Sequence, residues 1–205
     1  MRHRETILCA VLLACALGAG APLMAQKKKG APMPSQEEIM KRWQAYMTPG
    51  PEHNAMASMS GTWTAEIKMW MGGPGSEAQT STGTAEYSMV LGNRYMKQEV
   101  TATMMGMPFN GIGYTAYDNF KKKYVGSWMD NMGTGISTME GTADASGKTI
   151  TMWGLMDEPT TGEKNKKVKY VTKIVDADTQ IFEIYDVSAY GEKAPTMQMT
   201  YKRKK

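Results

Sequence analysis

Thiols and imidazoles are scarce in this 205-residue chain, which has two cysteines and two histidines. Cys9 and Cys15 both fall within the first 25 residues, which we predict are removed. The remaining chain then has no thiol for catalysis, a disulfide or a thiolate metal site. His53 is the one histidine beyond that point, which excludes a multi-histidine metal site. It lies outside the predicted strands and no Gly-x-Ser-x-Gly motif occurs, so the sequence also excludes a Ser-His-Asp catalytic triad. We expect His53 at a helix start or on the surface.

The sequence also lacks an apolar run long enough to cross a bilayer, which takes about 20 residues. Two arginines precede an apolar stretch over 7–17, and small residues follow up to Ala25. This order is typical of a signal peptide, which we predict over 1–25. We therefore expect a periplasmic or secreted bacterial protein with no transmembrane segment after cleavage. Lipoprotein anchoring at Cys15 is the alternative, because residues 12–15 loosely resemble a lipobox.

No charge of one sign dominates, since 22 basic and 19 acidic residues follow position 25. The lysines occur in short clusters separated along the chain. Nucleic-acid binding would need basic residues gathered on one face. We interpret the clusters as solvated turns and termini, and we expect no nucleic-acid partner.

The pattern after the signal peptide divides into three parts. Residues 26–34 are rich in Lys, Gly and Pro and predict a flexible spacer. Residues 35–60 predict two short helices, the first capped by Ser35 and the second over 52–59. From residue 61 to 205 the apolar residues recur with period two, which is typical of half-buried strands.

Nine turn signals divide this last part into ten strands with no helical segment between them. Short connections between neighbours favour an up-and-down antiparallel order, and closure removes the exposed edges. We therefore predict an all-β, antiparallel up-and-down barrel with one or two short N-terminal helices. The predicted strands are 63–71, 79–90, 94–104, 108–117, 123–130, 135–143, 149–156, 166–175, 180–188 and 195–203.

Several motifs carry a family resemblance. Gly61-Thr62-Trp63 resembles the Gly-x-Trp entry of lipocalin-like barrels, in which the tryptophan packs across the barrel base. A longer set resembles the bacterial family called domain of unknown function 1579, over roughly residues 52 to 203. The resemblance implies an exported, calycin-like barrel and implies no activity. The motifs of this set are GYTAYD at 113–118, KYV at 123–125, WMD at 128–130, EGT at 140–142 and TYKR at 200–203.

Residues 111–116 match the glycine pattern of dinucleotide-binding proteins on paper. That pattern works where a strand turns into a helix N-terminus, and here the strand continues to Tyr117. We interpret Gly111 and Gly113 as relieving crowding or permitting curvature. Paired carboxylates fall in turns, so no catalytic residue is assigned; enzymatic activity is left open and not favoured.

Methionine is unusually frequent, with 19 of 21 beyond the signal peptide. Thioethers are soft ligands that select Cu(I), which makes soft-metal binding an alternative function. The candidate ligands are Met69, Met71, Met104, Met105 and Met107. Methionine also fills irregular gaps in cores and pockets. Because the chain has little Leu and Phe, this second interpretation is the one that we favour.

A ten-stranded barrel is wide enough to enclose a ligand. We predict that this one binds or carries a small apolar or amphiphilic molecule, with no cofactor identified and the oligomeric state open. The predicted wall includes Trp63, Tyr87, Met96 and Trp128. An inward pair of Arg94 and Glu140 would hold a polar end, unless these side chains face water. A third hypothesis is a structural envelope module with a solid barrel.

Overall fold

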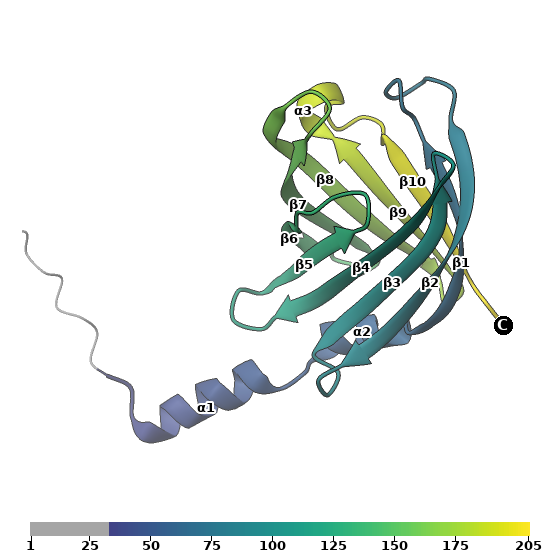
Figure 1. Ribbon diagram of the computed structural model, residues 1–205. Coiled ribbons are helices and arrows are strands. Elements are labelled where there is room, and N and C mark those ends of the chain that lie inside the picture. The colour runs from purple at the N-terminus through teal and green to yellow at the C-terminus, as the bar shows by residue number, and fades with distance from the viewer. Residues whose placement is uncertain (1–32) are drawn as a thin grey trace, which may run out of the picture. The chain divides into compact units, whose positions relative to one another are not determined.

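Ten antiparallel strands close into a barrel in the computed structural model, which describes residues 33–205 (Figure 1). Each strand pairs with its neighbour in the chain, and the last pairs with the first. The predicted up-and-down all-β barrel is confirmed. The strands are β1 (Gly61–Met69), β2 (Gln79–Val90), β3 (Tyr95–Met104), β4 (Met107–Asp118), β5 (Lys123–Asp130), β6 (Ser137–Ala143), β7 (Thr149–Glu158), β8 (Glu163–Asp176), β9 (Thr179–Asp186) and β10 (Met197–Arg203). The predicted signal peptide, Cys15 and the spacer up to residue 32 lie outside the described residues.

Three helices accompany the strands: α1 (Gln36–Met47), α2 (Pro51–Ser58) and α3 (Val187–Tyr190). The first two match the predicted N-terminal helices. The single turn of α3 replaces the end of the strand predicted over 180–188. Its cause is Asp186, whose carboxylate accepts a hydrogen bond from the Ala189 N–H at 3.1 Å and caps the turn.

Period-two alternation places the apolar side chains inside the barrel. In β1 the buried residues are Trp63, Ala65 and Ile67, whereas Thr64 and Glu66 are exposed. Paired residues on neighbouring strands share a face, so this register propagates around the barrel. One continuous core results, formed by inward side chains of the strands and by part of α2.

The end of the barrel at which α2 lies (Figure 1) is closed by buried side chains of the core. Met56 of α2 is completely buried there and belongs to the same core as Trp63, whose indole N–H donates to the Met59 carbonyl at 3.0 Å. The Arg203 guanidinium lies 4.2 Å from the Trp63 ring centroid and donates to the Ser60 carbonyl at 2.6 Å. The C-terminal strand is thereby joined to the segment that leads into β1.

α1 does not share in this closure, since none of its residues is buried. Its expected apolar face leaves Trp43 and Tyr46 about half exposed. Its C-terminal end is held by Asn119, whose side-chain amide donates to the carbonyls of Tyr46 and Thr48 at 3.1 and 2.8 Å. Of the two helices, α2 is therefore the one that covers a barrel end.

At the opposite end, β2 and β3 separate. Their pairing stops at Gly83 and Ala102, although β2 continues back to Gln79 along β1, and β3 continues to Met104 along β4. A notch in the wall therefore lies at this rim.

Candidate functional site

A cavity of about 250 Å³ lies inside the barrel, and every strand from β2 to β10 contributes to its wall. Most of its lining is apolar, as is usual for sites that bind small molecules. The lining residues are Tyr87, Gln98, Val100, Met104, Phe109, Tyr114, Thr115, Gly126, Ser127, Trp128, Asp130, Ser137, Met139, Met152, Met156, Tyr170, Thr172, Gln180, Phe182, Ile184, Met197, Met199 and Tyr201.

Trp128 forms the broadest aromatic part of the wall. Its indole stacks on Phe109 with ring centroids 6.4 Å apart, and its N–H donates to the Asp130 carboxylate at 2.9 Å. A Cβ at Gly113 would lie 2.7 Å from this indole, and one at Gly111 would overlap it. The two glycines therefore make room for Trp128, which confirms that the pattern over 111–116 relieves crowding within a strand.

Methionine supplies much of the rest of the wall, from four different strands. Its unbranched thioether adapts to irregular space and contacts aromatic rings favourably. One sulfur also accepts a hydrogen bond, from the Tyr201 hydroxyl to Met199 Sδ at 3.0 Å. The cavity methionines other than Met104 are Met139, Met152, Met156, Met197 and Met199.

Polar side chains gather towards the closed base. The Tyr87 hydroxyl interacts with the side chains of Tyr201 and Gln98, and its ring lies against Trp63 with centroids 6.1 Å apart. Burial raises the pKa of Tyr87 well above its usual value and the pKa of Tyr201 to about 12, so both phenols are neutral at physiological pH. Gln180 pairs with Tyr201 across β9 and β10.

The predicted inward pair of Arg94 and Glu140 is wrong. Arg94 precedes β3, and its guanidinium donates outside the barrel to the Met47 carbonyl at 2.8 Å. Glu140 alternates with the inward Met139, so it faces outward and pairs with Lys123 at 2.6 Å. That lysine lowers the pKa of the Glu140 carboxyl.

The other predicted site residues lie at two levels. Tyr87 and Trp128 line the cavity. Trp63 and Met96 are buried but belong to the packed layer near α2. The site prediction left out Gln98, although the sequence placed it in the inward register with Met96, and it missed Gln180. Extending the alternation of Phe182 by one step was the available signal for Gln180.

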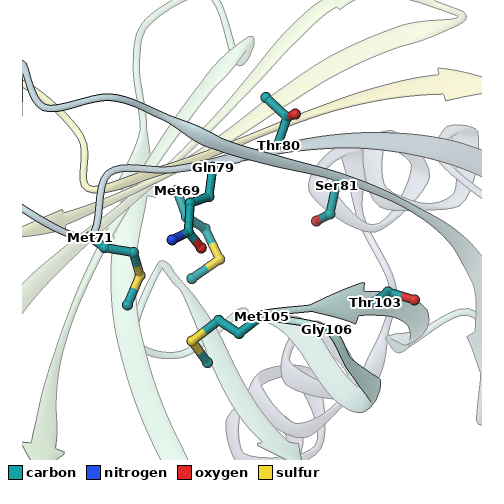
Figure 2. A pocket seen from close by; sticks show the side chains of 8 residues that line it. All are labelled: Met69, Met71, Gln79, Thr80, Ser81, Thr103, Met105 and Gly106. Atoms are coloured by element: carbon teal, nitrogen blue, oxygen red, sulfur yellow. The ribbon is translucent and has the colours of Figure 1, made fainter.

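A second pocket, of about 590 Å³, occupies the notch between β2 and β3. Figure 2 shows Met69, Met71 and Met105 around it, with Gln79 and the backbone turn at Gly106. Met104, by contrast, lines the central cavity, and Met107 lines neither. The five methionines considered for a soft metal are therefore divided. Within residues 33–205, no group of three or more His, Cys, Asp or Glu side chains is placed to hold a metal.

His53 was expected at a helix start or on the surface. It lies at the start of α2, and it is buried. Its Nδ1 accepts from the Gly50 N–H at 3.0 Å. Among residues 33–205, no helix has the length and apolar character needed to cross a membrane.

Comparison with solved structures supports the fold. The crystal structure of Rv2717c from M. tuberculosis is similar with a TM-score of 0.56 at 12% identity, over 77% of this chain and 100% of that one. At this identity the likeness concerns the fold alone. No curated protein matches the sequence. A family model matches residues 48–203, and the chain belongs to that family, which is described as protein of unknown function (DUF1579).

Proposed function

We propose that this chain is an extracytoplasmic protein that binds or carries a small, mostly apolar molecule inside its barrel. The observation that supports this most is the cavity of about 250 Å³, walled by inward aromatic and methionine side chains. An apolar cavity of roughly 150 Å³ is enough to hold benzene. The space therefore suits a ligand somewhat larger than one aromatic ring.

The two alternative functions have less support. A solid structural module would leave no such cavity in the barrel. A soft-metal site built from all five candidate methionines would need them together, whereas Met104 lies in the central cavity and Met105 at the rim. The cavity also lacks the charged pair that the sequence suggested for an amphiphile, so its polar contacts must come from uncharged groups.

A pair of matched substitutions tests ligand binding. Ser137 faces the cavity and its neighbour Thr138 is exposed on the outer surface. Ser137→Trp should therefore fill the cavity, whereas Thr138→Trp adds the same side chain outside it. We expect native mass spectrometry of protein purified gently from its host to show a small-molecule adduct on the wild type and on Thr138→Trp, and none on Ser137→Trp.

The same three proteins would also be titrated with acetophenone after any resident ligand is removed. Binding by the wild type and Thr138→Trp, lost in Ser137→Trp, is the expected result. A wild type that carries no adduct and binds no acetophenone would contradict the proposed function.

Export is tested separately, by sequencing the N-terminus of the protein from an envelope extract. We expect it to begin at Gln26, as the predicted cleavage after Ala25 requires. A full-length chain confined to the cytoplasmic fraction would contradict the extracytoplasmic part of the proposal.

A further inference from the structure

Gln180 lines the central cavity and carries a hydrogen-bond donor without a partner. The residue is 96% buried, and its Nε2 is shielded from solvent and has no hydrogen bond. It is the one buried side-chain nitrogen or oxygen in residues 33–205 without a hydrogen bond. Buried polar groups are almost always paired, so an unpaired one at a cavity calls for an explanation.

The neighbouring polar groups already have partners. The Tyr201 hydroxyl donates to Met199 Sδ, and the Tyr87 hydroxyl interacts with the side chains of Gln98 and Tyr201. Tyr201 stands directly across from Gln180 in the β9–β10 pairing, so this set forms one polar end near the closed base. Within it, the amide of Gln180 has no hydrogen bond, and rotation about its last side-chain bond would turn its N–H towards a molecule in the cavity.

Charge in the cavity restricts what that molecule can be. Among the described lining residues Asp130 is the one carboxylate, and none is a lysine, arginine or histidine. Asp130 already accepts from the Trp128 indole N–H and the Met132 backbone N–H, each at 2.9 Å. An anion would therefore be buried without a counter-charge, which is strongly unfavourable.

We infer that the cavity selects a neutral molecule with a hydrogen-bond acceptor, such as a carbonyl, at one end, and that Gln180 binds this acceptor near the closed base. The apolar part of the molecule then lies among the methionines and aromatic rings nearer the rim. This inference rests on the proposed function and specifies the class of ligand.

Three probes of similar shape separate the contributions: acetophenone has a neutral acceptor, ethylbenzene has none, and benzoate is an anion. Gln180→Leu removes the donor and leaves an apolar side chain that is one atom shorter. We expect this change to lower the affinity for acetophenone, relative to the affinity for ethylbenzene, by on the order of tenfold in calorimetric titrations. Comparing ratios between two proteins cancels the different hydration of the probes. Benzoate should bind more weakly than acetophenone at pH 7.

Gln198→Leu is the matched control, because Gln198 is half-buried on the outer face and donates to Glu183 at 3.0 Å. It should leave the probe ratio unchanged. An unchanged ratio in Gln180→Leu, or tighter binding of benzoate than of acetophenone by the wild type, would overturn the inference while leaving ligand binding intact. If the wild type binds none of the probes and carries no host molecule, the proposed function fails and the inference fails with it.

Discussion

At the scale of single residues, the fit of Trp128 against β4 depends on two glycines. Gly111→Ala would place a methyl group where the indole now lies. Overpacking of this kind costs about 1–3 kcal/mol, and we expect a loss of that size in the free energy of unfolding measured with urea. Gly135→Ala is the control, because nothing lies within 4 Å of its added methyl, and it should stay within about 0.5 kcal/mol. Equal effects of both changes would contradict this account.

His53 gives the fold a pH dependence. Burial lowers the pKa of its imidazole below the ordinary 6.5, and Nδ1 must be unprotonated to accept from Gly50. The unfolded chain therefore binds more protons than the folded one just below pH 6.5. The contribution of His53 to the free energy of unfolding is fully present above that pH. It is lost as the pH falls towards the lowered pKa of the folded state, with a slope of at most about 1.4 kcal/mol per pH unit.

The measurement is urea unfolding between pH 7 and pH 5, a range above most carboxyl titration. His53→Gln supplies the comparison, because glutamine at the third helical position also accepts from the capping backbone N–H and does not titrate. We expect a flatter profile for the variant. Parallel profiles for the two proteins would show that His53 is not the group responsible.

At the scale of elements, the contrast between strand faces determined what could be predicted. In β1, Trp63 and Ile67 alternate with polar residues, so the inward face was clear from the sequence. In β6, Ser137 and Gly141 point inward while Thr138 points outward, and neither face is distinctly apolar. Register is weakly specified by such a pattern, which is why Glu140 was assigned to the wrong face.

The polar end of the cavity could be predicted only in part, for a related reason. Gln98 and Gln180 are inward residues of a kind that usually faces water, so only their alternation with Met96 and Phe182 indicates the inward direction. Only the pairing of complete strands, such as Tyr201 with Gln180, reveals that they meet. Strand number and order, by contrast, follow from turn residues and short connections, and these were read correctly from the sequence.

Arg203 joins three elements at the closed base. It donates to the carbonyls of Ser58 at the end of α2, of Ser60 after it, and of Ala177 in the β8–β9 turn, and it covers Trp63. A lysine cannot reproduce this planar fork of donors. We therefore expect Arg203→Lys to lower the free energy of unfolding by about 2 kcal/mol, because bonds to a charged donor contribute roughly 1.5–3 kcal/mol each and lysine retains some of them.

Arg42→Lys on α1 is the corresponding control, since its pair with Glu38 is exposed and such pairs contribute little. It should change stability by less than about 0.5 kcal/mol in the same urea titration. Similar losses in both variants would mean that the base does not depend on the guanidinium geometry.

At the scale of the whole molecule, the methionines divide into a rim set and an interior set that a mild oxidant should distinguish. Met71 and Met105 are 56% and 52% exposed at the rim, whereas Met152 and Met199 are 6% and 7% exposed at the cavity. Peroxide converts accessible methionine to its sulfoxide. We expect the rim pair to oxidise first, as followed by mass spectrometry of peptides.

Saturation with acetophenone should then slow oxidation of Met152 and Met199 by about tenfold at ten times its dissociation constant, because the occupied cavity excludes the oxidant. Met56 separates this effect from general stabilisation, since it is a completely buried residue of α2 and does not line the cavity. If the ligand acts by occupying the cavity, the oxidation of Met56 is slowed less than that of Met152, and the oxidation of the rim pair is not slowed. Equal slowing of Met56 and Met152 would mean that both oxidise through unfolding of the whole barrel, and rim protection would place the ligand in the notch between β2 and β3.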